Sequence, residues 1–190
     1  MSEFTRVFVD IETFSEADLR KTGSAKYAEH PSTRILMMSW GIAGKVYTWE
    51  ESQGEDAMAE ALEVLNNPSY RISCWNISFE WALFKHCWGI EIPYTRCHDD
   101  MVAAMSLALP AALGDCGPAL GFDPEDVKSK DGSRLIQKFS KPRKPSKHKP
   151  WTRNTFETDP DDWAEFVKYN RQDVVAEARI YSRIRRWVEE

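Results

Sequence analysis

The chain has 190 residues, of which 42% are apolar, and it carries eight tryptophans and a formal net charge of −5. This length fits one well-buried domain over residues 1–190 and is short for two, and the apolar content excludes global disorder. No stretch approaches the roughly 18 apolar residues of a membrane span, and the N-terminus lacks the basic-then-apolar order of a signal peptide. We therefore expect a cytoplasmic protein.

The first 66 residues of the chain predict three strands and a helix. Residues 5–12 and 34–43 are rich in β-branched, aromatic and other apolar residues, which is typical of strands. A glycine turn leads into a third strand at 46–49. Apolar residues at helical spacing then predict a helix over 56–66.

A short buried strand is expected at 71–75, and an aromatic-rich helix at 77–87. Residues 96–98 are consistent with an edge strand. Asp99 or Asp100 is expected to cap a helix that runs toward residue 109, since Asp is favoured at helix N-caps. The same two acids are candidate metal ligands in an alternative interpretation, with Asp99 at the rim of a cleft.

The chain after residue 110 predicts helices over 111–120 and 133–139, an irregular stretch over 140–158 that contains three prolines, and a long final helix that starts at 159–160. Strands at the start followed by alternating strands and helices favour an α/β layer fold with a mixed sheet. The four cysteines form no CxxC pair and are expected to be free, mostly buried thiols. A zinc site from Cys87, Cys97 and His98 is the alternative.

Asp10 and Glu12 lie two residues apart at the end of the first predicted strand. Residues at this spacing point to the same face, about 6.6–7 Å apart, while Val9 and Ile11 face the opposite layer. Two solvated acids on an exposed strand are the alternative interpretation. Charged residues are normally kept outside, so an acidic pair on an inward face indicates a functional site.

Glu80 lies one turn into the predicted helix over 77–87, and Asn76 lies near the start of that helix. Alone, Glu80 fits a surface position and Asn76 fits an N-cap, although a capping Asn can also line a cleft. Tyr169 and Asp173 are four residues apart on the last helix and therefore share one face. Alone, they fit an ordinary pair on a helix surface.

Together the three clusters supply four carboxylates and one phenol. Carboxylates brought together repel one another unless cations lie between them, and oxygen-rich sites suit Mg²⁺ or Mn²⁺. Two such cations, about 3.5–4 Å apart, can activate water and stabilise the leaving oxygen of a phosphodiester. A Tyr with an ordinary pKa of about 10 would act by hydrogen bonding. The sequence thus predicts a two-metal phosphodiesterase.

Residues 128–149 hold nine Lys or Arg and a single Asp, so this segment is strongly basic and the rest of the chain is acidic. We expect a basic, partly irregular arm over about 128–158 that binds a polyanion. The alternative is a solvated loop whose lysines keep the protein soluble.

These motifs resemble those of the proofreading 3′–5′ exonucleases of the DEDD superfamily, in the subclass with a Tyr in the third motif. FVDIETFSEADL is similar to the first motif, WNISFE to the second and YNRQDVV to the third. The stretches KYAEHPS, CHDDMVAAMSLALP, ALGF and KDGSRLIQKFSKPRK are similar to the exonuclease domain of phage-type family A DNA polymerases.

The resemblance implies a ribonuclease H-like fold, with a five-stranded mixed β-sheet flanked by α-helices. It implies that Asp10, Glu12 and Asp173 hold the cation that activates water and that Asp10 bridges to a second cation. Glu80 would support the site, and Tyr169 would position the nucleophile. The usual acid of the second motif is Asp, so the longer Glu80 side chain is a departure that bears on metal affinity and rate.

Substrate-binding roles follow for four residues. Asn76 is expected to approach the substrate strand, and Phe14, or alternatively Trp151, is a candidate for stacking on terminal bases. Lys141 and Arg143 of the basic arm are expected to contact the phosphate backbone.

The resulting hypothesis is a metal-dependent 3′–5′ exodeoxyribonuclease that acts on single-stranded DNA ends, releases nucleoside 5′-monophosphates and proofreads for a DNA polymerase. The polymerase would be in cis in a longer parent or a separate chain. One alternative is a 3′–5′ exoribonuclease. Another is a catalytically silent module that grips single strands or docks a polymerase.

Overall fold

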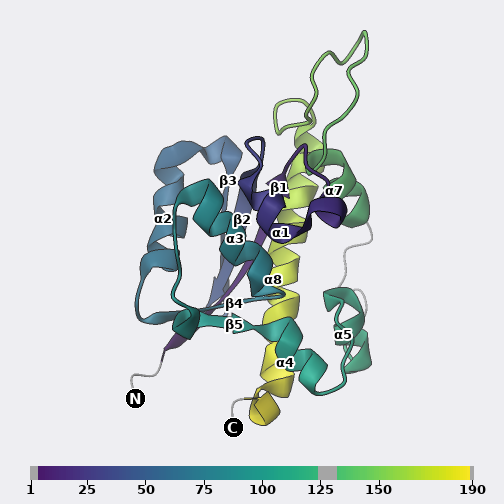
Figure 1. Ribbon diagram of the computed structural model, residues 1–190. Helices are drawn as coiled ribbons and strands as arrows, with labels where there is room; N and C mark the ends of the chain where they lie inside the picture. Colours follow the sequence, from purple (N-terminus) through teal and green to yellow (C-terminus); the bar gives the residue numbers. More distant parts are fainter. Residues whose placement is uncertain (1–3, 124–131, 189–190) are drawn as a thin grey trace.

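The computed structural model describes residues 4–123 and 132–188 and contains one five-stranded sheet with helices on both faces (Figure 1). The strands are β1 Thr5–Phe14, β2 Arg34–Ile42, β3 Lys45–Glu50, β4 Tyr70–Cys74 and β5 Cys97–Asp99. Their order across the sheet is β3-β2-β1-β4-β5. The β1–β2 and β2–β3 pairs are antiparallel, and the β1–β4 and β4–β5 pairs are parallel. The predicted α/β class, with a mixed five-stranded sheet, is confirmed.

The predicted helices are present, with ends that differ by a few residues. One helix, α1, was not predicted, because its sequence lacks apolar periodicity and Gly23, with φ +76°, interrupts it. Residues 128–131 of the predicted basic arm lie outside the described residues. The helices are α1 Leu19–Glu29, α2 Gly54–Asn66, α3 Ile77–Trp88, α4 Asp100–Ser106, α5 Leu113–Ala119, α7 Gly132–Phe139 and α8 Pro160–Val188.

Side-chain alternation along β1 separates two layers. Its odd-numbered residues Val7, Val9 and Ile11 are buried in the cluster that includes side chains of α1, α2 and α3. Its even-numbered residues face α8, as the ring contact of Phe8 with Tyr181 indicates (centroids 5.5 Å apart). Helix α8 runs along this second face (Figure 1).

Helix α8 packs very closely on the sheet at Gly41 of β2. A Cβ atom at this position would lie 2.8 Å from Val174 Cγ1, which is less than van der Waals contact allows. Glycine therefore sets the distance between the sheet and the helix that carries the third motif.

The β1–β2 ladder contains an irregularity immediately after Glu12. Glu12 is paired with Met37 but Thr13 with Ile35, so Leu36 is an extra residue on β2. Such bulges bend a strand locally and are frequent beside active sites. Leu36 and Met37 are both buried, in the cluster that α7 and α8 form against the sheet.

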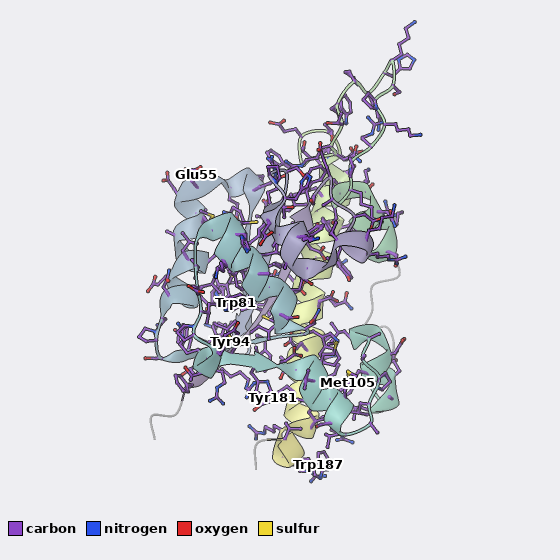
Figure 2. The ribbon with its side chains drawn as sticks, viewed as in Figure 1. Glu55, Trp81, Tyr94, Met105, Tyr181 and Trp187 are labelled. Atoms are coloured by element: carbon purple, nitrogen blue, oxygen red, sulfur yellow. The ribbon has the colours of Figure 1, made fainter. Side chains whose placement is uncertain are left out.

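All four cysteines are free, as expected, and Cys74 and Cys116 are buried. Across the described residues, no helix has both the length and the apolar character needed to cross a membrane. A few large apolar side chains are exposed, among them Tyr94, which stacks on Trp81, and also Met105 and Trp187, which lies at the lower end of the view in Figure 2.

Candidate active site

The strand β1, the first turn of α3 and the middle of α8 carry the four predicted carboxylates. Asp10 and Glu12 project from β1 toward α8, where Asn170 donates a hydrogen bond through Nδ2 to Asp10 Oδ2. Asp173 lies one turn further along α8. Helix α3 follows directly after β4, which is the parallel neighbour of β1, so its first turn places Glu80 within electrostatic range of Asp10.

Burial and mutual repulsion raise the pKa values of these acids. Burial raises the pKa of Asp10 well above its ordinary value, the charge of Asp173 raises it further, and the Asn170 hydrogen bond lowers it. Burial also raises the pKa of Glu12, with further increases from Asp10, Asp173 and Glu80. The pKa of Asp173 is raised to about 7, chiefly by burial. The carboxylates therefore form one repelling group.

Glu80 is the most deeply buried of the four acids, with 4% of its surface exposed. Its Oε2 atom has no hydrogen-bond partner, and burial followed by the charge of Asp10 raises its pKa. A buried carboxylate oxygen without a donor carries a desolvation cost unless something positive is bound beside it. Glu80 thus has the properties expected of a ligand or a supporting residue for a cation.

The donor set fits hard divalent cations, since all four groups are carboxylates and one oxygen is left unpartnered. Among residues 4–123 and 132–188, however, no three His, Cys, Asp or Glu side chains already lie close enough together to enclose one ion. This also applies to the alternative zinc site at Cys87, Cys97 and His98. The fit is therefore one of chemistry and charge.

Tyr169 shares a hydrogen bond with Asp173, one turn away on α8. Burial, followed by the charge of Asp173, raises the pKa of Tyr169 far above its ordinary value. The phenol therefore keeps its proton and acts as a hydrogen-bond donor. Its ring stacks on Phe166, with planes 7° apart and centroids 6.3 Å apart.

Asn76 occupies the N-cap position of α3, but its side chain makes no capping bond. It adopts a left-handed conformation (φ +76°, ψ +57°), which Asn tolerates better than most residues. Its Oδ1 accepts a hydrogen bond from Ser78 Oγ. The role as a side-chain cap is thus corrected, and Asn76 remains half-buried beside the first turn that carries Glu80.

The proposed substrate residues differ in accessibility. Phe14 is only 5% exposed and packs in the core against α7 and α8, with the guanidinium of Arg153 over its ring, so it is a core residue in this structure. Arg143 donates hydrogen bonds to the carbonyl oxygens of Lys149 and Trp151 and therefore closes its own loop. Lys141 is exposed.

A groove of about 610 Å³ adjoins Glu12 and is lined by the end of β1, the start of α1 and one side of α7. Lys141 lies at its border, as do Phe79 and Gln137. A smaller groove of about 260 Å³, between the β2–β3 turn and α8, includes none of the four carboxylates. The larger groove is the one that leads to the acidic cluster.

The part of the basic arm that follows α7, residues 141–150 (the basic loop), projects beyond the body of the molecule (Figure 1). Its turn is closed by backbone hydrogen bonds between Ser146 and Lys149. Lys138, at the base of the loop, is bound to Asp159 and Asp162 and has a structural role. Lys144 and Lys147 are exposed and make no ion pair within the described part of the chain.

Sequence reasoning missed a second buried acidic pair. Asp100 (0% exposed) and Glu177 (1% exposed) are close enough to interact, and burial, followed by the charge of Asp100, raises the pKa of Glu177. His98 Nδ1 lies 2.8 Å, and Arg6 Nη1 3.7 Å, from Asp100 Oδ1. Asp100 is one of the candidate metal ligands predicted from the sequence, and for Glu177 the available signal was its i, i+4 spacing after Asp173. The expected capping role belongs to Asp99, which accepts a hydrogen bond from the Val102 amide.

Comparison with known proteins gives a family match over residues 7–185, to RNase_H_2, described as RNase_H superfamily. The chain is 33% identical over 178 residues to the DNA polymerase of Bacillus phage SP02, an alignment that covers 93% of this chain but only 27% of that polymerase. Two solved structures share the fold at low identity. Escherichia coli RNase D, an exoribonuclease involved in structured RNA processing, is 12% identical with a TM-score of 0.55, over 96% of this chain and 40% of RNase D. The Aedes aegypti Nibbler EXO domain is 14% identical with a TM-score of 0.52, over 97% and 79% of the two chains.

Proposed function

The chain belongs to the RNase_H superfamily, and from this premise we propose that it is a divalent-metal-dependent 3′–5′ exonuclease acting on single-stranded DNA. The observation that carries the proposal is the convergence of four carboxylates from β1, α3 and α8 beside one groove, with a protonated phenol next to them. Packing or solubility does not require four repelling acids in one place.

Asp10, Glu12 and Asp173 would hold the cations, and Glu80 would support the site from the first turn of α3. Bound cations would supply an activated water and a positive charge for the leaving oxygen. The raised pKa of Tyr169 keeps its hydroxyl protonated, so the hydroxyl can donate a hydrogen bond. This hydrogen bond would orient the attacking water. The Asn170 hydrogen bond lowers the pKa of Asp10, so it favours the charged form that a cation requires.

The groove beside Glu12 is the proposed site of the 3′-terminal nucleoside. Lys141, where the basic loop begins, is one of its lining residues. The exposed Lys144 and Lys147 would contact backbone phosphates, which makes binding dependent on salt. Asn76 is proposed to approach the strand, whereas the buried Phe14 is not retained as a stacking residue.

DNA is preferred over RNA as substrate because the relative with 33% identity is a phage DNA polymerase. A proofreading role, with a polymerase as partner in cis or in trans, is proposed on the same ground. The structural similarity to RNase D supports the fold alone, so an exoribonuclease is an outcome of the test.

The test uses a 5′-labelled single strand incubated with the protein and Mg²⁺ or Mn²⁺, with EDTA and Asp10→Ala as controls. A ladder that shortens from the 3′ end, and is lost in both controls, is the expected result. Matched DNA and RNA strands separate the two substrates, and product chromatography identifies 5′-monophosphates. Full activity of Asp10→Ala would contradict the two-metal proposal, and binding without cleavage in either metal would favour the silent module.

A further inference from the structure

The backbone of α7 touches the ring of Tyr169 directly at Gly132. A Cβ atom at this position would lie 2.5 Å from Tyr169 Cε2 and 3.0 Å from both Cδ2 and Cζ. The first distance is shorter than real Cβ contacts and the other two are tighter than most of them, so any residue other than glycine requires the ring or the helix to move. Gly132 is buried in the first turn of α7.

The ring of Tyr169 has little room to retreat. The ring stacks on Phe166, which is fully buried in the cluster that α7 and α8 form. Its hydroxyl is bound to Asp173 on the same helix. A ring displaced from Gly132 would therefore lose its stacking on Phe166 or carry its hydroxyl away from Asp173.

Two sides of helix α7 contact different parts of the molecule. Leu135 and Phe139 are buried in the core beneath it, on the side where Gly132 meets Tyr169. Ser133, Ile136 and Gln137 line the groove beside Glu12. The same short helix thus forms a wall of the proposed substrate groove and the support of the phenol.

Helix propensity alone does not favour the glycine at position 132. Alanine favours a helix over glycine, and the φ of Gly132 is not in the left-handed region that glycine alone adopts readily. A role in local backbone conformation therefore does not explain the glycine. The close approach to Tyr169 does.

We propose that Gly132 is a positioning residue for Tyr169: the missing side chain lets α7 hold the phenol at the height where its hydroxyl reaches Asp173. Helix α7 therefore both lines the groove and sets the position of the phenol, so a shift of this helix would change the groove and the phenol together. The functional part of this inference rests on the proposed nuclease activity, whereas the packing part does not.

The test is a double-mutant cycle of Gly132→Ala and Tyr169→Ala in the full chain. Gly132→Ala is expected to lower kcat about 10–100-fold, as small misplacements of a catalytic group do, with little change in KM. In the Tyr169→Ala background, where the ring is absent, Gly132→Ala is expected to have no further effect. Equal losses in both backgrounds would overturn the proposal, because they would indicate a general folding defect.

A second measurement does not depend on activity. The ring signal of Tyr169, in NMR spectra of metal-free protein labelled at tyrosine, is assigned by its loss in Tyr169→Phe. It is expected to shift in Gly132→Ala, and the melting temperature is expected to fall by no more than an overpacked core position costs. An unshifted signal with a wild-type kcat would overturn the proposal. If the wild type cleaves nothing in either metal, the nuclease proposal fails, and the NMR shift still decides whether Gly132 positions the ring.

Discussion

Asn170, which is fully buried on α8, donates a hydrogen bond through Nδ2 to Oδ2 of Asp10 on β1. This bond joins the third motif to the first and opposes the rise that burial imposes on the pKa of Asp10. It therefore favours the ionised carboxylate at a position where burial and the charge of Asp173 both favour the protonated one.

Asn170→Leu, which has a similar shape but no donor, should raise the pKa of Asp10 further. We expect activity near pH 7 to fall about 10–100-fold, as for the loss of partners that orient metal ligands. The rising limb of the pH–rate profile should move to higher pH. Lys168→Ala, an exposed neighbour on the same helix, is the matched control and should leave the profile unchanged. A wild-type profile for Asn170→Leu would show that the bond has no part in preparing Asp10.

The acidic cluster makes the stability of the metal-free protein depend on pH. The pKa of Asp173 is about 7 in the folded state and about 3.9 in an unfolded chain, so the folded state binds more protons between these values. Stability is therefore greatest below about pH 4 for this group and falls as the pH rises to 7. The raised pKa values of Asp10, Glu12 and Glu80 act in the same direction.

We expect the melting temperature of the metal-free protein to fall between pH 5 and about 7, and Asp173→Asn to flatten this slope. The pKa of Asp162 is lowered to about 2, so its contribution to stability falls as the pH falls, but only below about pH 4. Mn²⁺ should restore more stability at pH 8 than at pH 5, because it binds the ionised acids of the folded state. A melting temperature that Mn²⁺ leaves unchanged at pH 8 would count against a cation site.

The substitution Glu80→Gln removes the carboxylate charge of Glu80 while keeping the shape of its side chain. The amide removes one buried negative charge from a repelling group, so we expect a higher melting temperature in EDTA together with activity about 10–100-fold lower. Glu80→Asp keeps the charge but shortens the side chain, and should lower activity less than Glu80→Gln. Calorimetry in EDTA and single-turnover cleavage measure the two effects. An amide variant with full activity would remove Glu80 from the site.

The basic loop should contribute through exposed lysines and not through Arg143. Replacement of Lys144 and Lys147 by Ala should weaken single-strand binding and lower the salt slope by about 0.7 for each phosphate that is no longer neutralised. Arg143→Ala breaks two hydrogen bonds to loop carbonyls, so it should increase proteolysis of the loop as well. Fluorescence anisotropy at several salt concentrations measures the slope. An unchanged slope in the lysine variant would favour the solvated-loop interpretation.

The sheet was predictable because its strands are short apolar runs bounded by turn residues, and because β1 alternates clearly between two faces. Helix α1 was not, since its residues show no apolar stripe and Gly23 breaks its course. The acids of the three motifs could be selected from spacing and resemblance. Their proximity depends on a parallel β1–β4 pair and on the path of α8, which no local pattern encodes.

The residues that surround the acids were harder to find. Asn170 lies inside the third motif, but a buried amide has no sequence signature, and Gly132 gains its importance from a contact 37 positions away in the chain. Phe14 was expected at the substrate, and its burial follows from packing by α7 and α8. Long-range contacts decided each of these cases.

The extra residue Leu36 divides the β1–β2 ladder into two independent parts. Pairing before the irregularity fixes the direction of Asp10 and Glu12, and pairing after it fixes where the chain leaves toward α1 and the groove wall. Because a one-residue slip in a ladder exchanges the faces of all later side chains, a change confined to the second part can reshape the groove while the acids stay in place. Substitutions in the second part could therefore alter which nucleic-acid 3′ end the groove accepts without moving the carboxylates, provided that Leu36 is neither deleted nor duplicated.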